Sequence, residues 1–176
     1  MNEAEVELVR RLARGEQAAF AELYDALGAA LYRVAWGLLG SRSEAEDAVQ
    51  DVFVALVQAG SRLLQVENFK AYLFVALRHA ALRRRSRERR LIRVPLEEAA
   101  QVAAPLAETG ELEALLATLP EEQREAVVLK IKGELTFAEM ATVLGVSANT
   151  AASRYRYALE KLRASCTEQE QKHARP

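Results

Sequence analysis

Apolar side chains recur every three or four residues over positions 3–90, which is the spacing of amphipathic helices. Gly15 separates a first helix from a second, and Gly37 and Gly40 end the second. Ser43, with Glu46 three residues later, forms a capping box that predicts a third helix over about 43–59. Gly60 ends that helix, and a fourth is predicted over about 68–90.

A second helical set follows residue 110. Pro120 is placed to open a helix at its first position, which runs to about residue 132. Thr136 and Glu139 form a capping box for a short helix, and Gly145 makes the turn that ends it. Ser147 then caps a longer helix that reaches about residue 164.

The stretch 94–110 lacks helical spacing. It contains Pro95 and Pro105, three acidic residues and no basic one, which is typical of a flexible linker. Its 17 residues reach about 56 Å when fully extended. The sequence therefore predicts an all-α protein with two small helical domains, over 1–93 and 111–164, and a disordered tail over 165–176.

Composition excludes several classes of function. No apolar run approaches the roughly 20 residues that span a bilayer, and the acidic start is not a secretory signal, so a cytoplasmic protein is expected. Cys166 has no second cysteine to pair with, and His79 and His173 are far apart, so neither metal nor cofactor is expected. No pattern unites a nucleophile, a base and a metal, which argues against an enzyme.

The segment 136–147 and the helix after it have the form of a helix-turn-helix. Ala141 is small enough to let two helices approach, and Gly145 supplies the turn. On a helical wheel, one face of the last helix is apolar and the other could meet a major groove. The outward positions are Asn149, Ala152, Ser153, Arg156 and Glu160. An ordinary helical hairpin with a solvated face is the alternative interpretation.

Two other faces carry charge. Positions 83–93 hold seven arginines against Glu88 alone, which suits phosphate contacts or, alternatively, a merely solvated basic surface. The predicted third helix places Asp47, Gln50 and Asp51 on one side, with an apolar row on the other. Physical chemistry alone interprets the acidic side as solvated surface. Phe69 and Phe74 are assigned to the core.

Together these segments resemble the sigma-70 superfamily, and specifically its extracytoplasmic-function (ECF) group. Residues 31–53 resemble the first part of the family's region 2, and residues 68–74 with the arginine run resemble its promoter-facing part. Residues 119–124, the helix-turn-helix and residues 153–163 resemble region 4. The resemblance implies a four-helix region 2 domain, a helix-turn-helix region 4 domain, and a role in promoter-specific transcription initiation.

The resemblance also implies partners and contact residues. Core RNA polymerase would bind the third helix, promoter DNA would bind both domains, and an anti-sigma factor is a further expected partner. The expected polymerase contacts are Asp47, Gln50, Asp51 and Phe53. The expected contacts to the unpaired −10 strand are Lys70, Tyr72, Arg78, His79, Arg83, Arg84 and Arg87, beside a loop over about 60–67. The expected contacts to the −35 duplex are Ser147, Asn149, Thr150, Ala152, Ser153, Arg154 and Arg156.

Three positions depart from the family pattern. Tyr72 stands where tryptophan is usual, His79 where asparagine is common, and Ala152 where a basic residue is common. The −35 contacts therefore fall mainly to Ser153, Arg156 and Asn149, and His79 is expected to be partly buried. Two rival functions stay open: a stand-alone helix-turn-helix regulator, and a sigma-like protein that acts mainly through a protein partner such as an anti-sigma factor.

Overall fold

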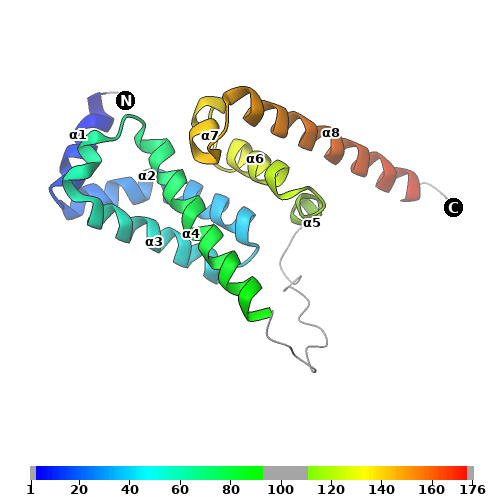
Figure 1. Cartoon of the computed structure of the whole chain (residues 1–176), viewed down its shortest axis with the longest axis horizontal. Coiled ribbons are helices and arrows are strands. Elements are labelled where there is room, and N and C mark those ends of the chain that lie inside the picture. Colours follow the sequence, from blue (N-terminus) through cyan, green and yellow to red (C-terminus); the bar gives the residue numbers. More distant parts are fainter. Residues whose placement is uncertain (1–2, 93–110, 174–176) are drawn as a thin grey trace. The chain divides into compact units, whose positions relative to one another are not determined.

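The computed structural model describes residues 3–92 and 111–173, and all regular secondary structure in these residues is helical (Figure 1). The chain divides into two compact units, the first containing helices α1 to α4 and the second containing α5 to α8. The all-α prediction with two helical domains is therefore confirmed. The predicted linker over 94–110 falls outside the described residues.

The first unit consists of α1 (Glu3–Ala13), α2 (Gln17–Leu39), α3 (Arg42–Ala59), a short 3-10 helix η1 (Gly60–Gln65) and α4 (Phe69–Ile92). Helices α2, α3 and α4 pack against one another, and α1 packs against η1 and α2. Their apolar stripes meet in a core whose largest fully buried members are Leu12, Leu23, Leu31, Leu56, Leu63, Phe69, Leu73, Phe74 and Leu77. Each contributes about 1.5–3 kcal/mol by leaving water.

The start of α3 differs from the prediction. Ser41 is the N-cap, with an extended backbone and a hydroxyl that accepts a hydrogen bond from the Glu44 amide at 3.4 Å. Ser43 lies in the first turn, and its hydroxyl is 3.2 Å from that of Ser41. The predicted Ser43 capping box is thus wrong, because two serines compete for the cap and the earlier one has the extended conformation a cap needs. Glu46 is left on the outer surface of α3.

The helix ends follow local rules. Gly40 adopts φ 70°, the left-handed conformation that ends α2, whereas Gly37 lies inside that helix and does not end it. Beyond α3, where a loop was expected, η1 forms instead. The Arg62 guanidinium donates to the Gln58 carbonyl at 3.0 Å, which satisfies one of the acceptors exposed at the end of α3.

The second unit consists of α5 (Glu111–Ala117), α6 (Glu121–Ile131), α7 (Phe137–Leu144) and α8 (Ala148–His173). Helix α8 packs against α6 and α7 around the buried Leu129, Met140 and Ala151. Pro120 is the residue before α6 rather than its first residue. Helix α5 was not predicted.

Helix α8 continues to His173, past the predicted end at residue 164. Residues 165–173 were expected to be disordered. This segment is polar, but five of its nine residues are Glu, Gln or Lys and none is glycine or proline, so its composition is compatible with a helix.

Candidate functional site

Helix α3 has one face in the core and one in solvent. Val49, Val52 and Leu56 are buried, whereas Asp47 and Gln50 are exposed. Asp47 and Gln50 form a row with the half-buried Asp51 and the exposed Val54, at positions i, i+3, i+4 and i+7 of the helix. We call Asp47, Gln50, Asp51 and Val54 the α3 outer face.

Phe53 does not belong to the α3 outer face. Its ring centre lies 5.6 Å from that of Tyr24 on α2, with the planes tilted by 57°. It is half-buried in this contact. Phe53 therefore joins α3 to α2, and part of its surface is used inside the domain.

The structure brings together two residues that the sequence assigned to different surfaces. The Arg84 guanidinium on α4 donates through Nη1 to Asp51 Oδ2 at 2.5 Å, and its Nε lies 3.1 Å from Glu44 Oε2. The hydrogen bond to Asp51 raises the pKa of Arg84, and the carboxylates of Glu44 and Asp47 act in the same direction, against the effect of burial. Arg84 has only 16% of its side chain exposed, so it bridges α3 and α4.

The remaining predicted −10 contacts divide around α4. Tyr72, His79, Arg83 and Arg87 follow one another at steps of seven, four and four, which places them on one side of a helix with 3.6 residues per turn. We call these four residues the α4 stripe. Lys70 and Arg78 lie at other angles, are half-buried and have partners within the protein.

His79 is exposed, so the expectation that it is partly buried is wrong. The core face of α4 is formed by Leu73, Phe74 and Leu77, all with no exposed surface. Position 79 lies on the opposite side of the helix from this row. The imidazole of His79 is therefore accessible, on the same side of α4 as the rest of the α4 stripe.

The helix-turn-helix forms as predicted. The Thr136 hydroxyl accepts from the Glu139 amide at 3.2 Å, while Glu139 accepts from the Thr136 amide at 2.7 Å, completing the capping box. Gly145 adopts φ 68° in the turn, and the Ser147 hydroxyl accepts from the Thr150 amide at 3.0 Å to begin α8. The Phe137 and Tyr155 rings, 5.9 Å apart, join α7 to α8.

Helix α8 presents Asn149, Ser153 and Arg156 at steps of four and three on one face. Asn149 and Arg156 are exposed, Ser153 is half-buried, and Ala152 beside them is half-buried and has no hydrogen-bonding group. Arg154 points elsewhere: its Nη2 lies 2.8 Å from Glu122 Oε2 on α6, and 22% of its side chain is exposed. Arg154 thus joins α8 to α6.

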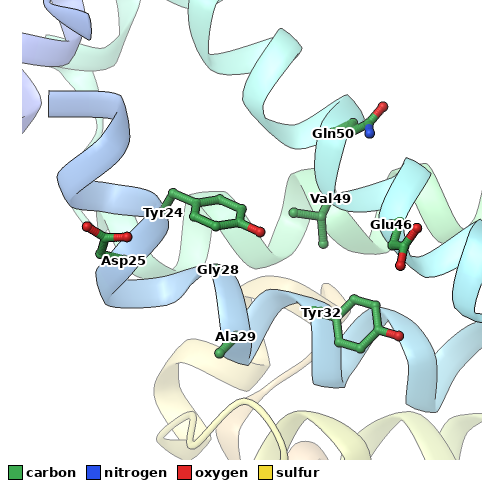
Figure 2. Close-up of a pocket in the computed structure, with 8 residues that line it drawn as sticks. All are labelled: Tyr24, Asp25, Gly28, Ala29, Tyr32, Glu46, Val49 and Gln50. Carbon is green, nitrogen blue, oxygen red and sulfur yellow. The ribbon is translucent and has the colours of Figure 1, made fainter. Parts of the chain in front are cut away.

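A groove that the sequence analysis did not identify lies between α2 and α3. Tyr24, Gly28 and Tyr32 are spaced by four residues along α2, and Trp36 follows at the same spacing. Figure 2 shows the two tyrosines on either side of Gly28, with Val49 of α3 opposite and Glu46 extending toward Tyr32. The cavity has a volume of about 620 Å³. The i, i+4 aromatic row was the signal in the sequence that could have revealed it.

In the part of the chain that the structure describes, no helix is long and apolar enough to cross a membrane. Within the same residues, no three histidine, cysteine or acidic side chains are grouped so that they could hold a metal ion.

Comparisons with known proteins agree with this architecture. The family model for sigma-70 region 2 matches residues 23–91, and that for sigma-70 region 4 matches residues 109–162. The chain is 29% identical over 168 residues to the ECF RNA polymerase sigma factor SigK of Mycobacterium tuberculosis, covering 89% of this chain and 90% of SigK. It is 31% identical to SigE of Mycolicibacterium smegmatis, covering 86% of this chain and 64% of SigE.

Two solved structures are similar as well. CnrH, in complex with the cytosolic domain of CnrY, matches with a TM-score of 0.71 and 28% identity over 94% of this chain and 99% of CnrH. The sigma factor RpoE of Bartonella quintana, in complex with the anti-sigma factor NepR, matches with a TM-score of 0.64 and 25% identity over 82% of this chain and 94% of RpoE. With both sigma regions present in order, the chain belongs to the sigma-70 family as an ECF sigma factor, the class of protein that directs RNA polymerase in transcription initiation.

Proposed function

We propose that this sigma factor binds core RNA polymerase through the α3 outer face, in the cytoplasm and without catalysing a reaction itself. The observation that carries the proposal is the division of α3 into a buried apolar side and an outward row with Asp47 and Gln50 exposed. The domain's own core does not need these polar groups. An acidic, exposed helix face is suited to a basic surface on a partner, which it attracts over a Debye length of about 8–10 Å.

The α4 stripe would hold the unpaired −10 strand. Tyr72 offers an aromatic face on which a base can stack, and Arg83 and Arg87 offer exposed cations for phosphates. His79, exposed between them, is placed to contact a base edge or a phosphate. Arg84 is a weaker candidate than its neighbours because its guanidinium already bridges two carboxylates.

Helix α8 would read the −35 duplex from the major groove. Asn149, Ser153 and Arg156 carry the hydrogen-bonding groups of its outward face, and arginine and asparagine match the edges of guanine and adenine. Ser147 and Thr150 lie at the helix start, where amide groups favour a phosphate. Ala152 can contribute only apolar contact. The preferred −35 sequence should therefore depend mainly on Asn149, Ser153 and Arg156.

An anti-sigma factor is a second proposed partner. RpoE is bound to an anti-sigma factor in its solved structure, and this chain shares its fold over most of its length. A protein that acted only through such a partner would not direct transcription with added core enzyme. A stand-alone regulator would protect duplex DNA without polymerase, and it would leave the first domain without a role.

The direct test combines binding and transcription. Purified protein is titrated into core polymerase, and the holoenzyme is used for run-off transcription with start-site mapping. Asp47→Arg should abolish core binding with unchanged circular dichroism, whereas Glu3→Lys, an exposed acidic residue on α1, should bind normally. Normal co-purification of Asp47→Arg with core polymerase would refute the docking proposal. Asp51 is a poorer site for charge reversal, because the change would also break the Arg84 bridge.

A further inference from the structure

We infer that the groove between α2 and α3 receives an arginine side chain from core RNA polymerase, next to the α3 outer face. This inference rests on the proposed docking function and extends the contact from one helix to two. The walls of the groove are Tyr24 and Tyr32 from α2 and Val49 from α3, and Gly28 lies beneath the Tyr24 ring. Gln50 lines the groove and also belongs to the α3 outer face, so the two surfaces are continuous.

Gly28 lets the ring of Tyr24 lie close against α2. A Cβ at position 28 would lie 3.1 Å from a carbon of the Tyr24 ring, closer than most side-chain contacts. The groove lies between this ring and that of Tyr32, with Val49 and Glu46 of α3 opposite. Glycine is unfavourable inside a helix by about 1 kcal/mol relative to alanine, so the close position of the Tyr24 ring has a cost in helix stability.

The chemistry of the lining favours a cation. Two tyrosine rings supply the negative faces that attract a guanidinium, and Tyr24 has 58% of its surface exposed. Asp25 and Glu46 add two exposed carboxylates to the lining, and none of the eight lining residues is basic. Electrostatic complementarity therefore selects a positively charged side chain over an acidic one.

Arginine fits the groove better than lysine, and a contact next to the groove illustrates why. At the next position of the aromatic row, the Arg42 guanidinium carbon already lies 5.8 Å from the centre of the Trp36 ring. A planar guanidinium stacks on an aromatic ring and pairs with a carboxylate at its edge, whereas an ammonium group acts as a point charge. The groove offers that combination through Tyr32 and Glu46, with no arginine of its own.

The experiment measures binding of full-length variants to core polymerase, without DNA, by fluorescence titration. Ala29→Leu adds a side chain at an exposed lining position and should weaken binding at least tenfold by narrowing the groove, and Glu46→Lys should do the same by charge reversal. Glu3→Lys has the same charge change as the latter on an exposed site outside the groove, and it should bind as the wild type does. Tyr24→Leu distinguishes a cationic occupant from an apolar one, because leucine keeps an apolar surface but lacks the aromatic ring. If the occupant is an arginine, Tyr24→Leu should weaken binding about fivefold.

Several outcomes would overturn the inference. If Asp47→Arg loses binding while Ala29→Leu and Glu46→Lys keep it, the docking proposal stands and the groove is not part of the contact. If only Ala29→Leu weakens binding, the occupant is apolar rather than an arginine. If the wild type does not bind core polymerase, both proposals fail. Circular dichroism identifies unfolded variants, and Ala29→Met, at the same exposed position, replaces Ala29→Leu if the latter does not fold.

Discussion

Breaking the bridge between Arg84 and Asp51 should destabilise the first domain, and a double-mutant cycle can isolate the interaction. Asp51→Asn removes one charge, and Arg84→Met removes the other while keeping an apolar stem over the core. The side chain of Asp51 is 43% exposed and that of Arg84 is 16% exposed. The pair therefore lies between an exposed ion pair, which contributes about 0.2–1 kcal/mol, and a hydrogen bond to a charged group, which contributes about 1.5–3 kcal/mol.

We expect a coupling free energy of about 1 kcal/mol, since the exposed side of Asp51 is screened by water. Arg84→Met alone should cost more, about 1–2 kcal/mol, because it also leaves Glu44 without its partner at 3.1 Å. Urea unfolding followed by tryptophan fluorescence is a clean assay, because Trp36 is the only tryptophan and lies in this domain. Its signal reports the unfolding of the domain that contains the bridge.

Arg87→Met is the matched control, because Arg87 is exposed on the same helix. It should change the free energy of unfolding by no more than about 0.5 kcal/mol. A coupling energy below about 0.3 kcal/mol, which is the level of ordinary non-additivity, would refute the idea that the bridge stabilises the domain. Loss of the same stability in Arg87→Met would show instead that the arginines act through general charge.

Three other predictions concern separate parts of the chain. Burial tends to raise the pKa of Glu16, but hydrogen bonds from Arg11 and Arg14 lower it below the ordinary 4.5. The ionised Glu16 therefore stabilises the fold above pH 4.5, and this stabilisation is lost as the pH falls through the lowered pKa. Glu16→Gln should accordingly flatten the acid side of a plot of unfolding free energy against pH. Thr136→Ala removes the cap of α7 and should speed hydrogen exchange of the α7 amides about fivefold, corresponding to about 1 kcal/mol; unchanged exchange would contradict the capping role. Arg156→Ala should weaken holoenzyme binding to a −35 duplex about tenfold at constant salt, and equal binding would remove this residue from the reading face.

Local signals predicted most of the helices because the interactions that begin and end them lie within a few residues. The capping box at Thr136 and the turn at Gly145 illustrate this, since each depends on neighbours in the sequence. The start of α3 was misplaced because Ser41 and Ser43 both suit a cap, and only the backbone conformation distinguishes them. Fold class and domain order were thus accessible, whereas the choice between adjacent caps was not.

Long-range pairing explains what the sequence analysis missed at the candidate site. Arg84 and Asp51 are 33 residues apart, so no local spacing announces that they meet. Arg154 resembles its neighbours in charge, yet it pairs with Glu122 from another helix. The exposure of His79, by contrast, followed from the position of Leu73 and Leu77 on the helical wheel and could have been predicted.

The Arg84 bridge also restricts how the first domain can change over evolution or be redesigned. A chimaera that takes α4 from one sigma factor and α3 from another would exchange one end of the bridge without the other, and could bury part of a charge that has no counterion. Positions 44, 51 and 84 should therefore be inherited as a set. A redesign of the outward side of α4 then requires leaving position 84 in place and varying exposed positions such as 79 and 87.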